Sequence, residues 1–197
     1  MARKKARRKP APRVIPRRLW LLAGSGIALL VLGGLAWWIY QQGQAYAAFQ
    51  EAVRRGQPAL SRVETFPEEG RAHLQPGERA NYRTDPPTSG PHSSEWVNPG
   101  FYTREQPPEH LVHSLEHGHV VIYYDDPGPE ALQTLQAWAR MFNGQWDGVV
   151  VVPKRRLGRA VILTAWTHML RLESFDVNAA AAFIDAFRGR GPENPVR

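Results

Sequence analysis

The chain has no cysteine among its 197 residues. A chain without thiols cannot form a disulfide, ligate an iron–sulfur cluster, build a cysteine-ligated zinc site or carry out thiol redox chemistry. Any metal ion must therefore be bound by histidine, methionine or carboxylate side chains. The folded part of the chain must be held together by non-covalent packing.

Residues 1–18 lack acidic side chains but contain nine Lys and Arg, whereas residues 41–197 contain 16 Lys and Arg against 18 Asp and Glu. The net charge of +7 therefore comes from a short basic tail. A nucleic-acid-binding domain needs basic residues clustered on the fold itself, so we expect no nucleic-acid partner.

Residues 19–40, LWLLAGSGIALLVLGGLAWWIY, contain no charged residue. As a helix they are about 33 Å long, enough to cross a hydrocarbon core of about 30 Å. Trp20 lies near one end and Trp37, Trp38 and Tyr40 at the other, as in aromatic belts at bilayer interfaces. The segment predicts a transmembrane helix with the lipid bilayer as its partner. The basic tail at 1–18 predicts a cytoplasmic N-terminus.

A cleaved signal peptide is the alternative, since AYA at 45–47 resembles a cleavage site. The apolar run is longer than a usual signal-peptide core of about 7–15 residues, however, and helical spacing continues after it. We therefore predict an uncleaved anchor followed by a helical stalk or linker at 41–61. The rest of the chain then forms an extracytoplasmic domain at the cell membrane, over residues 62–193, with a C-terminal tail at 194–197.

Residues 56–110 are a long connector rich in Pro and Gly with little periodicity. The part after residue 72 has too many aromatic residues for a solvated linker, so we expect those residues to pack on the domain. They are Tyr82, Trp96, Phe101 and Tyr102.

From residue 111 onward the pattern predicts regular elements. Strands are expected at 119–124, 148–153 and 160–166, where β-branched and aromatic residues gather. Helices are expected from Pro129 to about Phe142 and after Asp176. The order β-α-β-β-α favours an α+β fold, in which a small, mostly antiparallel sheet has its helices packed on one face.

Five stretches resemble a bacterial domain of unknown function, number 3105, over roughly residues 62–193. They are GRAHLQPGE, YRTDPPTSGPH, LVHSLEHGHVVIYY, ILTAW and FIDAFRGRGPE. The resemblance implies an extracytoplasmic domain behind an N-terminal signal or anchor, with no established activity. The positions that match the family motifs are His73, Pro86, Pro87, Thr88, Ser89, Gly90, Pro91, His92, His113, Glu116, His117 and Trp166. His119 and His168 do not match, so the resemblance implies no role for them. Many relatives have cysteines just after the first strand, where this chain reads YYDDPGPE, so a disulfide there is absent.

The segment LVHSLEHGH, residues 111–119, contains three of the seven histidines. In a straight strand His113 would be about 13 Å from His117, too far to share a metal ion. In a helical turn ended by Gly118, the same two residues are i and i+4 neighbours about 5–6 Å apart, with Glu116 nearby. We predict the helical turn, with the strand beginning at His119.

The rigid sequence PPTSGPH ends in His92, and its prolines reduce the entropy lost in holding that imidazole. We hypothesise that His92, His113 and His117 meet, with His73 or Glu116 completing a metal site. Nitrogen and oxygen ligands without sulfur suit Zn²⁺ or Cu²⁺, and Met141 or Met169 would be a soft extra ligand for copper.

Three functions remain open at this point. The first is a membrane-tethered metal-binding domain. The second is a non-catalytic interaction module, whose aromatic-rich loop docks a membrane or envelope partner and whose histidines are structural. The third and least favoured is a hydrolase that uses a bound metal. The sequence shows no activated nucleophile, and Ser114 between two histidines has no support beyond its position. General acid–base work, with Glu116 orienting an imidazole, is another use of the same residues.

Overall fold

The computed structural model describes residues 17–197, with side chains from residue 30 onward. The basic tail predicted at 1–18 lies outside this range except for its last two positions, and so do the side chains of residues 19–29 in the predicted span. In the part of the chain that is described, no helix is both long enough and apolar enough to cross a lipid bilayer.

The described chain comprises two compact units, which divide at Ala45 and Tyr46. Helix α1 (Arg17–Gly56) runs through both, and from Tyr46 onward it belongs to the second unit. The other helical elements are η1 (Gln57–Arg62), α2 (Pro108–Glu116), α3 (Pro129–Met141) and α4 (Val177–Phe187). The strands are β1 (Glu64–Thr65), β2 (Gly100–Phe101), β3 (Val120–Tyr124), β4 (Val149–Pro153), β5 (Val161–Ala165) and β6 (His168–Leu172).

Within the described residues, these strands form one six-stranded sheet in the order β1-β6-β5-β3-β4-β2. The α+β class is as predicted, but the sheet is mixed and not mostly antiparallel. Strand β4 pairs in parallel with both β3 and β2, whereas β3–β5, β5–β6 and β1–β6 are antiparallel. The parallel pairing follows from α3, because a helix between β3 and β4 is the kind of crossover that two parallel neighbours require.

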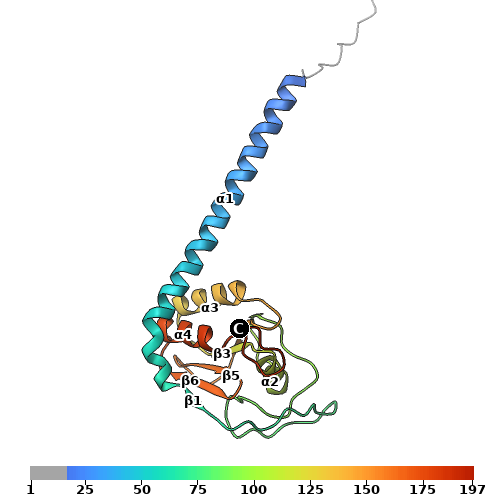
Figure 1. Ribbon diagram of the computed structural model, residues 1–197, viewed down its shortest axis with the longest axis vertical. Coiled ribbons are helices and arrows are strands. Elements are labelled where there is room, and N and C mark those ends of the chain that lie inside the picture. Colours follow the sequence, from blue (N-terminus) through green and yellow to red (C-terminus); the bar gives the residue numbers. More distant parts are fainter. Residues whose placement is uncertain (1–16) are drawn as a thin grey trace, which may run out of the picture. The chain divides into compact units, whose positions relative to one another are not determined.

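Helices cover both faces of the sheet, which corrects the prediction that they pack on one face (Figure 1). On one face, α3, α4 and the end of α1 enclose a core that includes Phe49, Leu135 and Phe183. On the other face, α2 buries Leu111, Val112 and Leu115 against Val121 and Val150. Alternate residues of β3 and β4 point into these two cores, so both strands are apolar throughout and buried on both sides.

A hairpin between β5 and β6 was missed by the sequence prediction, which ended the last strand at residue 166. Thr167 in its turn has φ 61°, although the turn contains no Gly, Asn or Asp. Strand β6 pairs with β5 over its whole length and extends the sheet towards β1.

The aromatic residues of the long connector pack on the domain to different degrees. Tyr82 and Tyr102 are partly buried against the α2 side of the core, and Phe101 packs against the opposite side. Trp96 remains 39% exposed. The connector from residue 66 to residue 107 is therefore part of the folded domain.

A candidate metal centre beside helix α2

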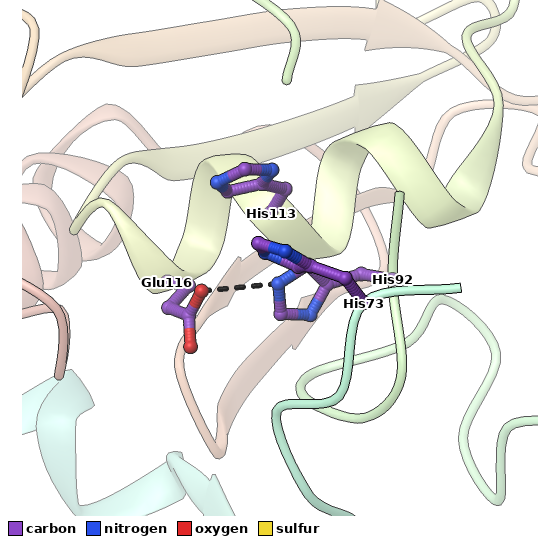
Figure 2. Close-up of side chains that lie close together, drawn as sticks. All are labelled: His73, His92, His113 and Glu116. Atoms are coloured by element: carbon purple, nitrogen blue, oxygen red, sulfur yellow. Dashed lines mark ion pairs between the residues drawn. The ribbon is translucent and has the colours of Figure 1, made fainter. Parts of the chain in front are cut away.

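Helix α2 has an apolar side and a polar side because of its sequence. Pro108 starts the helix, since its missing N–H is not needed there. Leu111, Val112 and Leu115 face the sheet, and His113 and Glu116 lie on the side that faces the connector (Figure 2). The predicted helical turn is the end of this helix, which begins at Pro108.

Gly118 ends this helix, as predicted, and allows the turn into β3. Its φ is 92°, a conformation that L side chains rarely adopt. The ring centroids of His113 and His117 are 4.7 Å apart, as expected for i and i+4 neighbours. The strand then begins at Val120, one residue later than predicted.

The rigid loop before His92 lies in the interior. Thr88, Ser89 and His92 have no solvent-exposed surface. Gly90 has φ 127°, and a Cβ there would meet the ring of Tyr82 at 3.0 Å, so only glycine fits this turn. The turn allows the Gly90 carbonyl to accept a hydrogen bond of 2.8 Å from Nδ1 of His92.

His73 is held beside His92 by backbone pairing. The two residues form a parallel bridge, in which the His92 N–H donates to Ala72 (3.0 Å) and the Leu74 N–H donates to His92 (2.8 Å). The ring centroids of His73 and His92 are 5.2 Å apart. His73 is exposed, so it lies on the solvent side of the group.

The imidazole of His113 lies close to both of these rings. Its centroid is 4.9 Å from that of His92 and 5.3 Å from that of His73. Its Nδ1 is 2.8 Å from the carbonyl oxygen of Ser93. A carbonyl oxygen can only accept a hydrogen bond, so Nδ1 carries the proton and Nε2 keeps a free lone pair. The same reasoning gives His92 a free lone pair on Nε2 when the ring is neutral.

Nε2 of His92 faces the carboxylate of Glu116. The two atoms are 3.0 Å apart, and Figure 2 shows this contact as the dashed line. Although the distance suits a hydrogen bond, Nε2 makes none, because the oxygen lies off the direction in which a ring N–H would point. With a neutral His92 ring, two buried acceptor atoms stand side by side, an arrangement that is costly unless a cation lies between them.

Burial keeps the neighbouring rings neutral. It lowers the pKa of His113 to about 4, and the nearby His117 and His92 rings lower this pKa further, while the Ser93 carbonyl raises it. Burial also lowers the pKa of His117, and this effect outweighs the carboxylates of Glu193 and Glu116, which raise it. A neutral imidazole is the form that binds a metal ion.

Two groups of potential ligands lie around α2. His73, His92, His113 and Glu116 can each offer one atom such that all four atoms lie within 4.8 Å of one another. Tetrahedral zinc ligands are about 3.4 Å apart for bonds near 2.1 Å, so these atoms need to draw together only slightly around an ion. Figure 2 shows two of these side chains coming from α2 and two from the connector.

His117 belongs to the second group, which contains His113, His117 and Glu193 within the same limit of 4.8 Å. Of the five residues predicted from the sequence, the structure thus brings four into one cluster and places His117 next to it. Glu193 was not predicted as a ligand. It lies in the C-terminal segment, and its Oε2 is 3.0 Å from Nε2 of His117. It ends the stretch FIDAFRGRGPE that carries part of the family resemblance, but that stretch contains no histidine and was not predicted to hold a ligand.

Tryptophan side chains surround these histidines. The His117 ring lies 4.7 Å from Trp96 and 4.5 Å from Trp146, measured between ring centroids. Trp166 meets the ring of His92 edge-on at 6.4 Å, and its Nε1 donates to Glu68. The two groups of histidines are therefore bordered by aromatic rings, while His73 stays open to solvent.

The other candidate residues have different surroundings. His119 is fully buried, and its Nε2 donates to the carbonyl oxygen of Gln145. Nδ1 of His168 lies 2.7 Å from the carbonyl oxygen of Trp166, and its ring packs against Phe187. Met169 is buried in the core beneath α2, and Met141 packs on the opposite face of the sheet.

Fold and site together define an α+β domain with a largely buried histidine–carboxylate cluster at the end of one helix. The family described as protein of unknown function (DUF3105) matches residues 73–197, which is more than half of the chain, and the chain belongs to this family. Comparison with curated proteins and with solved structures gave no match.

Proposed function

We propose that this protein binds a transition-metal ion, Cu²⁺ or Zn²⁺, through His73, His92, His113 and Glu116. The observation that carries the proposal is the arrangement of His92 and Glu116. Two acceptor atoms lie 3.0 Å apart in the interior with no hydrogen bond between them. A cation beside both atoms turns an unfavourable contact into two metal–ligand bonds.

The surroundings of the ligands support the same proposal. Metal-binding histidines usually donate their second ring N–H to a carbonyl or carboxylate, which fixes the ring and its tautomer. His92 and His113 both do so, through Gly90 and Ser93. Both carbonyls belong to the same short loop. The loop therefore orients two imidazoles at once.

The ligand set favours borderline metals over hard ones. Three imidazole nitrogens and one carboxylate suit Zn²⁺ or Cu²⁺, whereas Ca²⁺ and Mg²⁺ prefer all-oxygen sites. In the usual order of affinities, Cu²⁺ binds such ligands more tightly than Zn²⁺. We therefore expect Cu²⁺ to displace Zn²⁺ from the site.

We propose further that residues 19–40 anchor the protein in a membrane, with the basic tail in the cytoplasm and the domain outside. Support comes from the uncharged run of 22 residues and the nine basic residues before it. Carbonate extraction of membranes from cells that express the full chain tests this proposal. The chain is expected to stay in the pellet, and its release into the supernatant would contradict the anchor.

A docking role for the aromatic-rich connector has less support. Such a role needs exposed aromatic side chains, but Tyr82, Phe101 and Tyr102 are packed against the core. Trp96 is exposed in part, and its ring lies against His113 and His117. Trp96 thus packs on the histidines and the other three aromatic residues pack on the core, which leaves few exposed rings for docking.

Electron paramagnetic resonance of the Cu²⁺-loaded full chain tests the ligand set. The three histidines of the cluster predict hyperfine coupling to three imidazole nitrogens. His73→Ala should reduce this number by one. His110→Ala, a substitution on α2 outside the cluster, should leave it unchanged. A wild-type spectrum without coupled imidazole nitrogens would contradict the proposed site.

A further inference from the structure

The second group of ligands shares one residue with the first. His113 belongs to both, while His117 and Glu193 belong only to the second group. Because Nδ1 of His113 is engaged with the Ser93 carbonyl, only Nε2 can bind a metal ion. One nitrogen lone pair binds one ion at a time. Ions in the two groups must therefore compete for the same atom.

The structure holds Glu193 in place through its backbone. The Glu193 N–H donates to the carbonyl oxygen of Glu116 (3.3 Å), and the Gly189 N–H donates to that of Gly118 (2.8 Å). The C-terminal segment is thus attached to the end of α2, next to both groups. The carboxylate of Glu193 contacts the His117 ring, and the Glu193 side chain is 43% exposed.

His117 differs from the other two rings in how it is held. Its Nδ1 is buried and has no hydrogen-bond partner among the described residues. The ring is fixed by packing between Trp96 and Trp146 and by the contact with Glu193. No second hydrogen bond sets its orientation, so only the two tryptophan rings and Glu193 hold the imidazole beside the second group.

We propose that His113, His117 and Glu193 form a second metal position, which exchanges a single ion with the first position through the shared His113. This inference rests on the proposed function. An ion moves between the positions by keeping its bond to Nε2 of His113. It exchanges His117 and Glu193 for His92, Glu116 and His73. Each position supplies one carboxylate, so the ligand charge stays the same, while the number of protein ligands rises from three to four. The half-exposed Glu193 makes the second position the one from which an ion is exchanged with solvent or with a carrier.

Substituting ligands of the first position tests whether the second position still binds Cu²⁺. The full chain in detergent is titrated with Cu²⁺, and bound ions are counted by native mass spectrometry. Wild type is expected to bind one ion. The double variant His92→Ala, Glu116→Gln is expected to bind one ion about tenfold or more weakly, with two coupled nitrogens in its resonance spectrum.

Adding Glu193→Gln to the double variant should weaken binding by about a further tenfold. Adding Glu95→Gln should change nothing, because that glutamate is exposed and outside both groups. Glu193→Asp, which keeps the charge but shortens the side chain, serves as a second variant in case the amide disturbs the C-terminal segment. Added to the double variant, Glu193→Asp should also weaken Cu²⁺ binding. The resulting protein should retain the circular dichroism spectrum of wild type.

Two ions bound to wild type would overturn the sharing of one ion between the two positions. No ion bound to the double variant, or equal affinity with and without Glu193, would overturn the second position itself. All three outcomes leave the first position intact. A wild-type chain that binds no ion would instead refute the proposed function, so the two failures are distinguishable.

Discussion

Nε2 of His92 and Oε2 of Glu116 lie 3.0 Å apart in the protein interior, and no hydrogen bond joins them. His92 comes from a proline-rich loop and Glu116 from the last turn of α2. The fold therefore brings together two acceptor atoms that repel each other when the histidine is neutral. A change at Glu116 is therefore expected to have opposite effects on the stability of the metal-free protein and on metal binding.

Glu116→Gln is expected to stabilise the metal-free protein and to weaken metal binding. The neutral amide removes the repulsion between the carboxylate and Nε2 of a neutral His92, which raises the free energy of unfolding by about 1 kcal/mol. The lost carboxylate ligand reduces metal affinity by about tenfold or more. Urea unfolding with and without a chelator measures both effects. If the variant is instead less stable in the presence of chelator, the pair is an ordinary imidazolium–carboxylate ion pair.

A bound ion is expected to raise the melting temperature. At a free concentration about 100-fold above Kd, binding to the native state alone adds about 2.7 kcal/mol. For a domain of this size, that corresponds to an increase of roughly 5–10 °C. Differential scanning calorimetry with Cu²⁺ and with chelator measures it. His92→Ala should show a smaller increase, whereas His110→Ala should behave as wild type.

Acid is expected to destabilise the metal-free protein between about pH 6.5 and pH 4. Burial lowers the pKa of His119 to about 4, with the neighbouring His117 lowering it further and the Gln145 carbonyl and Asp147 raising it. Below the ordinary value of about 6.5 the unfolded chain takes up a proton that the folded chain does not, so stability falls as the pH falls. The shift corresponds to a loss on the order of 3 kcal/mol from this residue.

Urea unfolding across this pH range, with a chelator present, tests the contribution of His119. His119→Gln should make the unfolding free energy depend less steeply on pH, because the glutamine side chain does not titrate. Part of the slope should remain, since burial lowers the pKa of His113 and His117 as well. An unchanged slope in the variant would show that His119 has no part in the acid sensitivity.

Gly118→Ala is expected to destabilise the protein more than Gly70→Ala. Both glycines have positive φ, 92° and 104°, so both substitutions cost about 1–2 kcal/mol of backbone strain. A Cβ at position 118 also meets the backbone of Gly191 and Trp146 at 2.8 Å, whereas position 70 opens into free space. Equal losses of unfolding free energy in the two variants would show that the C-terminal segment does not pack on the end of α2.

The local elements were predictable because their signals are local. Pro129 and Asp176 mark helix starts, and the Asp176 side chain accepts hydrogen bonds from the N–H groups of Asn178 and Ala179. The i and i+4 spacing of His113 and His117 depends on a single helical turn. The hairpin turn at Thr167 was missed because threonine is not a usual turn residue with positive φ.

The long-range features depend on tertiary structure and leave little trace in the sequence. The parallel pairing of β3 with β4 arises from the path of α3 across the sheet. Glu193 reaches His117 only because the C-terminal segment hydrogen-bonds to Glu116 and Gly118. His117 was assigned to the same group as His92, but its neighbour Glu193 places it in a second group. Sequence spacing pointed to candidate residues that lie close together in the structure, and it left their partition between two groups undetermined.

Elemental analysis of the purified full chain tests the central claim most directly. The chain is equilibrated with Cu²⁺ or Zn²⁺, freed of loosely bound ions and compared with His92→Ala and His110→Ala. The account predicts about one ion per chain for wild type and for His110→Ala, and a clearly lower content for His92→Ala, which has lost a buried ligand and binds the ion more weakly. The same metal content in all three proteins would contradict it.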